Sequence, residues 1–176
     1  MNNTAQAAQK KPLGKLVLLL AGIALLLALF FMLGNKSQAP DVRIITVDGK
    51  SMHLSDLKGK MVLVDFWATD CPGCIIEMPK FAETYKQYHE KGFELVAVAM
   101  SYDPPEQVMH YRAKAGLPFI VAHDTTGEVS TGFGEITLTP TAFLIDKNGK
   151  IIRKVIGDMD FASLHQILDA QLLGKS

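Results

Sequence analysis

The chain has few of the residues that hold metal ions or cross-link a fold. It contains only two cysteines, Cys71 and Cys74, and its five histidines and eight methionines are scattered. A structural zinc site needs about four ligands, and no histidine stands at ligand spacing from another. A disulfide across so short a loop constrains little of the unfolded chain, so it would add little stability. We therefore expect no metal ligand set and no purely structural cross-link.

Clustered basic residues are also missing from most of the chain. The formal net charge is zero, and no run of Lys or Arg indicates a nucleic-acid surface. Residues 1–33 contain no acid and three lysines, which give this segment a charge of +3. The remainder has 15 basic and 18 acidic residues. The sequence thus has a basic head before a mildly acidic domain.

Charge is absent from residues 16–33, LVLLLAGIALLLALFFML. A helix of this length is roughly 27 Å long, close to the thickness of the bilayer's hydrocarbon layer. We predict a transmembrane anchor over 16–33, because signal peptides have shorter apolar cores. The alternatives are a cleaved signal, for which Ser37-Gln38-Ala39 resembles a cleavage site, and a buried core helix. Lysines before the span favour a cytoplasmic N-terminus and a domain in the periplasm or outside the cell.

These features divide the chain into four parts. We expect a cytoplasmic tail over residues 1–15, the anchor over 16–33, a polar linker over 34–41 and one domain over 42–175. No internal repeat is visible. Disulfide chemistry is permitted in the compartment that the orientation implies.

The domain reads as strands and helices in alternation, followed by a hairpin and a helix. Two short strands around Asp48-Gly49 predict an N-terminal hairpin. Asp103 before two prolines predicts a helix N-cap, and Asn148-Gly149 predicts a second hairpin. We expect further strands over 61–67, 93–100 and 119–122 and helices after the cysteines, over about 103–115 and from about 160. This order requires a mixed sheet flanked by helices, an α/β fold.

The two cysteines follow a strand and begin a helix, in the segment WATDCPGCIIEMP. Cα atoms three apart in a helix are about 5 Å from each other, which a disulfide tolerates. Cys71 would lie at the positive end of the helix dipole, which lowers its pKa and makes it the nucleophile. Cys74, one turn deeper, would resolve the mixed disulfide. Pro72 fixes the backbone in the first turn.

Asp65 interrupts the apolar strand MVLVDFW six residues before Cys71. A desolvated carboxyl has a raised pKa, and such a group could take the proton from Cys74. The alternative is a carboxylate that faces solvent at the end of a strand.

The segments VLVDFWATDCPGCIIEMPKF and TPTAFLIDKNGKII together resemble the thioredoxin fold, and more narrowly the membrane-anchored thiol–disulfide oxidoreductases of the TlpA/ResA type. The likeness spans roughly residues 40–175. It implies that Pro140 is cis and lies beside the cysteines, and that the backbone of Thr139 pairs with the substrate chain. It also implies that Glu77 tunes the thiol pKa values and that Trp67 shields the site. Trp67, Pro72, Thr139 and Pro140 would thus form the substrate-binding surface. The alternatives are a trans loop proline, a solvated glutamate and an ordinary core tryptophan.

The resemblance also implies partners. We expect net reduction of disulfides in apocytochromes c or copper-assembly factors, with electrons from a membrane thiol carrier of the DsbD/CcdA type. No cofactor is expected beyond the Cys71–Cys74 disulfide. Asp70 departs from the pattern, because related chains commonly have tryptophan there, and its charge opposes thiolate formation at Cys71.

Two other functions stay open. A peroxiredoxin would need Ser or Thr three residues before its reactive cysteine, whereas Ala68 and Cys71 occupy those positions. A copper or haem chaperone would use the thiols as ligands, with His123 as a third ligand. Such chaperones have three residues between the cysteines, and this chain has two.

Overall fold

The computed structural model describes residue 17, residues 19–25 and residues 37–174. The chain divides into two units, residues 1–36 and residues 37–176. In the first unit, residues 17 and 19–25 are helical. Most of the anchor predicted over 16–33 lies outside the described residues. Within the described ranges, no helix combines the length and the apolarity that a membrane crossing requires.

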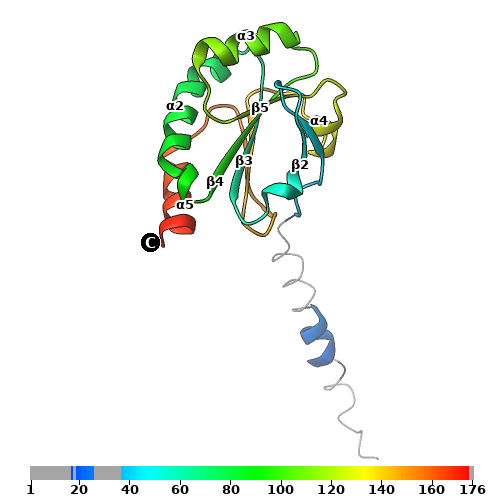
Figure 1. Cartoon of the computed structure of the whole chain (residues 1–176). Coiled ribbons are helices and arrows are strands. Elements are labelled where there is room, and N and C mark those ends of the chain that lie inside the picture. Colours follow the sequence, from blue (N-terminus) through cyan, green and yellow to red (C-terminus); the bar gives the residue numbers. More distant parts are fainter. Residues whose placement is uncertain (1–16, 18, 26–36, 175–176) are drawn as a thin grey trace, which may run out of the picture. The chain divides into compact units, whose positions relative to one another are not determined.

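The second unit is built around a mixed sheet of five strands in the order β5-β4-β3-β6-β7 (Figure 1). Strands β3, β4 and β5 are parallel, and β6 and β7 run antiparallel to their neighbours. Their bounds are β3 Met61–Trp67, β4 Phe93–Ala99, β5 Ile120–His123, β6 Thr141–Ile145 and β7 Ile151–Ile156. β3 and β4 are buried along their whole length, which explains why all of their residues except Asp65 and Glu94 are apolar. The predicted mixed α/β sheet is confirmed.

The helices and the remaining strands cover both faces of this sheet. Figure 1 shows α2 and α5 on one side of the central strands, and β2 with α4 on the other. The bounds are β1 Arg43–Ile45, β2 Ser51–His53, η1 Leu54–Leu57, α2 Pro72–Tyr88, η2 His89–Lys91, α3 Pro105–Ala115, α4 Glu128–Gly132 and α5 Phe161–Leu173. β1 and β2 pair antiparallel as a separate two-stranded sheet. η1 and α4 are not predicted from the sequence, because both are short and lack helical periodicity.

Strand alternation divides the core between the two faces. Odd-numbered residues of β3, such as Leu63 and Trp67, pack against α2, α3 and α5. Even-numbered residues, such as Val64 and Phe66, pack against β1, η1 and α4. Each face of the sheet is therefore buried by its own layer, and α2, which begins with the cysteines, is held over the odd-numbered face.

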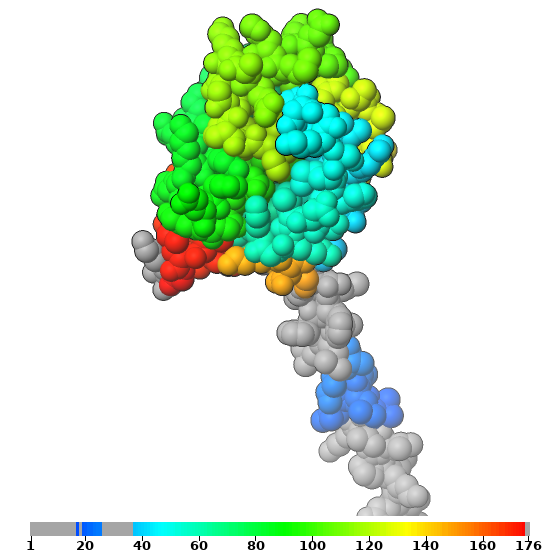
Figure 2. Space-filling model, viewed as in Figure 1, coloured from blue at the N-terminus to red at the C-terminus, as the bar shows by residue number. Residues whose placement is uncertain are grey.

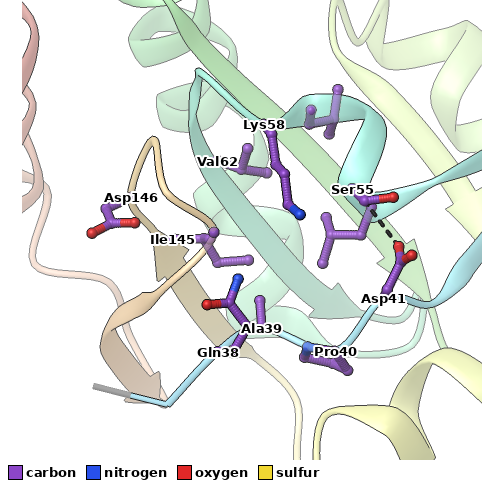
Figure 3. A pocket seen from close by; sticks show the side chains of 12 residues that line it. Gln38, Ala39, Pro40, Asp41, Ser55, Lys58, Val62, Ile145 and Asp146 are labelled. Atoms are coloured by element: carbon purple, nitrogen blue, oxygen red, sulfur yellow. Dashed lines mark hydrogen bonds between the residues drawn. The ribbon is translucent and has the colours of Figure 1, made fainter. Parts of the chain in front are cut away.

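Residues 37–41, expected as part of a linker, pack against the end of the domain away from α3. The Ala39 amide donates to the Gly149 carbonyl at 2.9 Å, and the Asp41 carboxylate accepts from the Ser55 amide at 3.1 Å (Figure 3). A pocket between η1 and the β6–β7 turn lies beside this segment. At the other end, the turn of the β1–β2 hairpin lies beside α3 (Figure 2), where Asp48 and Arg112 line one surface groove.

One predicted cap is wrong. Asp103 does not cap α3, because the N-cap is Pro104, whose side chain cannot accept a hydrogen bond. The Asp103 carboxylate instead accepts hydrogen bonds from Thr69. Two prolines in succession fix the entry to the helix without a side-chain cap, which leaves the aspartate free for another contact.

Candidate active site

Both cysteines lie where the chain passes from β3 to α2. They form a disulfide, and their Cα atoms are 5.3 Å apart. Cys71 is the N-cap of α2, and its sulfur accepts a hydrogen bond from the Cys74 amide at 3.3 Å. Cys71 is half-buried, whereas Cys74 is only 1% exposed. The more accessible sulfur therefore lies at the positive end of a long helix, where a thiolate is stabilised.

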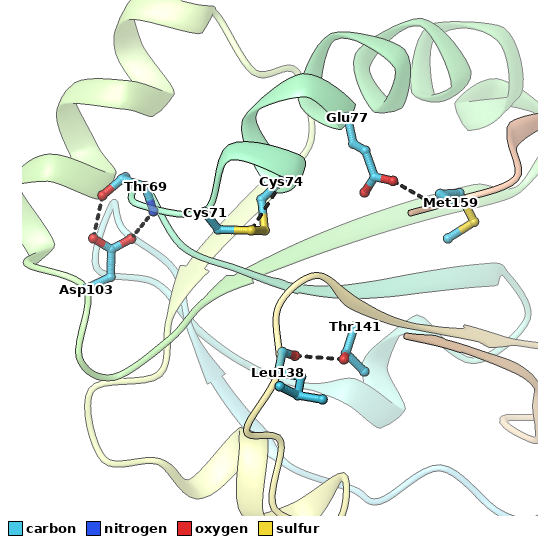
Figure 4. Close-up of a disulfide and its surroundings, with 8 residues drawn as sticks. All are labelled: Thr69, Cys71, Cys74, Glu77, Asp103, Leu138, Thr141 and Met159. Carbon is cyan, nitrogen blue, oxygen red and sulfur yellow. Dashed lines mark hydrogen bonds between the residues drawn. A yellow bond between two sulfur atoms is a disulfide. The ribbon is translucent and has the colours of Figure 1, made fainter. Parts of the chain in front are cut away.

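The register of the sheet brings several loops to this position. Trp67 of β3 pairs with Ala99 of β4, and Thr141 of β6 pairs with Ile156 of β7. The loops that leave β3, β4 and β7 and the loop that enters β6 therefore meet at one edge of the sheet. By this edge we mean the end where the C-terminal ends of β3, β4 and β7 lie beside the N-terminal end of β6. Helix α2 begins at the same edge, so residues far apart in sequence gather around the disulfide (Figure 4).

The loop before β6 lies directly against the turn between the cysteines. The Thr139–Pro140 peptide bond is cis, as the resemblance implies. A Cβ added at Gly73 would lie 3.8 Å from Cδ of Pro140 and 3.5 Å from Oδ1 of Asp158. The Gly157 amide donates to the Pro140 carbonyl at 2.9 Å. The cis-proline loop and the segment after β7 thus form two sides of the site.

The other residues predicted for the substrate surface divide into exposed and buried positions. Pro72 is exposed and Thr139 is half-buried at the sheet edge. Among the described residues, neither the amide nor the carbonyl of Thr139 makes a hydrogen bond, so both can pair with another chain. Trp67 is fully buried, with its ring 5.4 Å from that of Tyr111. Trp67 is therefore a core residue beneath the site, and a shielding role stays a prediction.

Asp65 lies inside the domain rather than at its surface. It is 1% exposed, and neither carboxyl oxygen has a hydrogen-bond partner among the described residues. As an odd-numbered residue of β3 it lies on the face that packs against α2, in line with Leu63 and Trp67. Burial, with a smaller contribution from the charge of Glu77, raises the pKa of Asp65 to about 8. The solvent-facing alternative is wrong.

Glu77 is also buried, at 5% exposure, and links α2 to the segment after β7. Its carboxylate accepts a hydrogen bond from the Met159 amide (Figure 4). Burial raises the pKa of Glu77, the Met159 amide opposes that shift, and the carboxylate of Asp158 adds to it. The solvated alternative is wrong here too, because the helix turn that carries Glu77 is covered by the loop before α5.

One polar contact at this edge is not predicted from the sequence. Thr69, two residues before Cys71, donates its amide and its hydroxyl hydrogen to the carboxylate of Asp103, at 2.7 Å and 2.6 Å (Figure 4). The carbonyl of Asp103 accepts from Nε2 of His123 at 2.7 Å. A buried acid after a strand can cap the next helix or accept hydrogen bonds from a neighbouring loop. The sequence pattern is the same in both cases, so only the fold shows which role the acid has.

The same contact bears on the chaperone alternative. Both ring nitrogens of His123 lie within hydrogen-bond distance of other groups, Nε2 at the Asp103 carbonyl and Nδ1 at Thr125 Oγ1, 2.9 Å away. Within the described part of the chain, no three His, Cys, Asp or Glu side chains form a group that could hold a metal ion. No contact seen here therefore favours a role for His123 as a ligand.

The charge of Glu77 is expected to act on Asp65. Replacing Glu77 by glutamine keeps an oxygen that accepts the Met159 amide but removes the negative charge, so the pKa of Asp65 should fall from about 8. The carboxyl carbon shift of Asp65, followed by NMR through a pH titration, measures this value. Asp158→Asn is the matched control, because Asp158 is exposed and bears on Glu77 rather than on Asp65. An unchanged Asp65 midpoint in Glu77→Gln would contradict the coupling.

Comparison with known proteins agrees with this geometry. A family model described as Redoxin matches residues 34–168. Thiol-disulfide oxidoreductase ResA of Bacillus thuringiensis subsp. konkukian (strain 97-27) is 38% identical over 131 residues, which are 74% of this chain and 75% of that protein. ResA of Bacillus subtilis (strain 168) is 35% identical over 133 residues, 76% of this chain and 73% of the relative.

Solved structures give the same result. A thiol:disulfide interchange protein of the thioredoxin family from Chlorobium tepidum TLS superposes with a TM-score of 0.71 at 31% identity, covering 78% of this chain and 97% of that one. The structure of MTB dsbF in its mixed oxidized and reduced forms gives a TM-score of 0.69 at 26% identity, covering 78% and 99%.

Proposed function

From its membership of the redoxin family and its similarity to the thiol–disulfide oxidoreductase ResA, we propose that this chain works by thiol–disulfide exchange. Its proposed role is to reduce disulfides in partner polypeptides outside the cytoplasm. The observation that carries the proposal is the pair of unequal sulfurs: Cys71 accessible at the start of α2, and Cys74 buried one turn deeper. This arrangement suits a nucleophile and a resolving thiol.

The exchange balances two electrons between the dithiol and the partner. The Cys71 thiolate attacks one sulfur of the partner's disulfide, forms a mixed disulfide and displaces the other sulfur as a thiolate. Cys74 then loses its proton and attacks the sulfur of Cys71, which releases the partner with both cysteines reduced. The product is the Cys71–Cys74 disulfide that the structure contains. Asp65, on the face of β3 beneath α2, is the group that we propose takes the proton of Cys74.

A polypeptide partner suits the surface around the disulfide. Large apolar side chains are exposed on three segments that meet at this edge, namely Ile76 at 66%, Leu138 at 61% and Ile156 at 59%. The backbone of Thr139, which makes no hydrogen bond within the part of the chain that the structure describes, offers hydrogen bonds to an extended segment. By analogy with the family, we propose apocytochromes c or copper-assembly factors as partners.

We further propose that residues 16–33 anchor the chain in the cytoplasmic membrane, with the domain on the outer side. The electrons would then come from a membrane thiol carrier of the DsbD/CcdA type. A tether to the same membrane raises the effective concentration of the domain near such a carrier. The proposed direction predicts a reduction potential for Cys71–Cys74 nearer to about −270 mV, as in thioredoxin, than to about −120 mV, as in DsbA. Equilibration with glutathione measures it.

Trapping of the mixed disulfide tests the proposed exchange. Cys74→Ser leaves the nucleophile but removes the resolving thiol, so a covalent adduct with a disulfide-bearing partner should accumulate and disappear on treatment with dithiothreitol. Cys71→Ser is the matched control. Its remaining thiol, Cys74, is buried and cannot reach a partner, so this variant should form little adduct. Equal adduct formation by the two variants, or no adduct with either variant, would contradict the proposed exchange.

A further inference from the structure

The turn that presents Cys71 is held from outside the C-x-x-C segment. Residues 68–71 form a tight turn in which the Cys71 amide donates to the Ala68 carbonyl at 3.2 Å. The first residue inside this turn is Thr69, whose amide and hydroxyl both donate to the Asp103 carboxylate. Figure 4 shows the two hydrogen bonds side by side, on the strand-end loops next to the disulfide. The Asp103 carboxylate thus accepts hydrogen bonds from both donors of Thr69, and the hydroxyl of Thr69 also lies 3.2 Å from Oε1 of Gln107.

Asp103 is itself held rigidly. It is 2% exposed, its amide donates to the Met100 carbonyl at 3.0 Å, and its carbonyl accepts from His123 at 2.7 Å. A carbonyl can only accept, so Nε2 of His123 carries the hydrogen in this contact. The loop after β4 is therefore tied to the end of β5, and the carboxylate projects from a fixed backbone.

The position of the turn matters because Cys71 is the N-cap of α2. Its sulfur accepts the Cys74 amide at 3.3 Å, which is a contact that stabilises a thiolate. A hydrogen bond of this kind depends on the placement of the sulfur over the helix end. Freedom in the turn at 68–71 would move the sulfur away from that amide.

We propose that Asp103 is a positioning residue for Cys71: by holding Thr69, it fixes the turn that sets the Cys71 sulfur over the start of α2. The inference rests on the proposed exchange chemistry of Cys71. The carboxylate acts on the thiol in two opposite ways, because its negative charge disfavours a nearby thiolate whereas its hydrogen bonds keep the sulfur in place. An experiment must therefore separate charge from geometry.

Two substitutions make that separation in the full-length reduced chain. Asp103→Asn removes the charge but can still accept the Thr69 amide and donate to the Thr69 hydroxyl, while Asp103→Ala removes both contacts. The readouts are the Cys71 pKa from thiolate absorbance and the rate of attack on 5,5′-dithiobis(2-nitrobenzoate). We expect a Cys71 pKa about one unit higher in Asp103→Ala than in Asp103→Asn, and attack about tenfold slower. Equal pKa values and rates in the two variants would overturn the proposal.

A milder variant covers the case in which Asp103→Ala does not fold. Thr69→Val keeps the charge and the amide contact but loses the contacts of the hydroxyl with Asp103 and Gln107, so attack should slow by about threefold and the Cys71 pKa should rise. A wild-type pKa and rate in Thr69→Val would again overturn the proposal. Failure of the proposed exchange would be seen differently, since Cys74→Ser with an intact Asp103 would then trap no mixed disulfide.

Asp124 is the matched control. It is another buried carboxylate at the same sheet edge, also 2% exposed, and it accepts the amides of Val129 and Ser130 at 3.0 Å and 2.8 Å. These amides belong to α4, which carries no cysteine. Asp124→Asn and Asp124→Ala should differ in stability but share one Cys71 pKa. A Cys71 shift in the Asp124 pair as large as that in the Asp103 pair would show that any buried acid at this edge has the effect, and would refute a specific role for Asp103.

Discussion

Replacing Asp65 by asparagine is expected to slow the release of the partner from the mixed disulfide by about a hundredfold, while the first attack by Cys71 keeps its rate. The two steps differ because their thiols differ. Cys71 is accessible and its sulfur accepts an amide hydrogen, so it needs no protein base. Cys74 is 1% exposed, so water cannot readily take its proton. Asp65 lies on the same face of the sheet as the core that contains Cys74.

The pKa of about 8 suits this role. A base works best when its pKa is near the working pH, and roughly a tenth of such a carboxyl is ionised at pH 7. The release rate of the wild-type chain should therefore rise with pH and level off above about 8. Asp65→Asn should lose this dependence, because its amide does not titrate.

Stopped-flow measurement separates the two steps. Fluorescence of Trp67, the only tryptophan and a member of the same buried core cluster as Cys74, follows the redox state, and a chromophoric partner disulfide reports each thiol released. Asp124→Asn removes a buried carboxylate at the same sheet edge and should leave both phases unchanged. A uniform slowing of both phases in Asp65→Asn would indicate a general disturbance of the fold and would count against Asp65 as the proton acceptor.

The sequence predicts the sheet and the cysteine chemistry because their signals are local. An apolar run interrupted only by Asp65 marks β3, since both of its faces are covered, and the helix start after it places Cys71 at the N-cap of α2. The cis-proline loop could be placed only by resemblance. Nothing in the spacing of residues 73 and 140 shows that they lie against each other, because that contact depends on antiparallel pairing of β3 with β6.

The acids show where local signals end. Asp65, Glu77 and Asp103 are all buried, yet they occur in an apolar strand, a helix and a proline-rich loop. A carboxyl in an apolar run can face solvent or core. Asp103 fits the pattern of a helix cap as well as that of an acceptor of hydrogen bonds from Thr69. The choice depends on which element packs above each residue. That information comes from strand register and helix placement, which single residues do not specify.

Asp65→Asn is also expected to stabilise the oxidised chain at alkaline pH, with a gain on the order of 5 kcal/mol above pH 8. The ordinary pKa of this carboxyl is 3.8, and burial raises it to about 8 in the folded chain. Between these two values the unfolded chain has lost the proton that the folded chain retains. The folded state therefore binds more protons, and its stability falls as pH rises from about 4 to about 8. Below this window both states are protonated, and above it the loss is complete.

Urea unfolding of the oxidised wild type and of Asp65→Asn, at intervals from pH 4 to pH 9, measures this difference. The two free energies of unfolding should lie close together near pH 4, where a protonated carboxyl and an amide are both neutral and equally buried, and should separate steadily up to about pH 8. A constant difference across the range would mean that Asp65 has an ordinary pKa, and the base proposed for Cys74 would lose its support. The expected pattern would instead mean that the chain retains the ionisable carboxyl of Asp65 at a cost in stability. An asparagine amide of nearly equal volume would fill the same position without that cost.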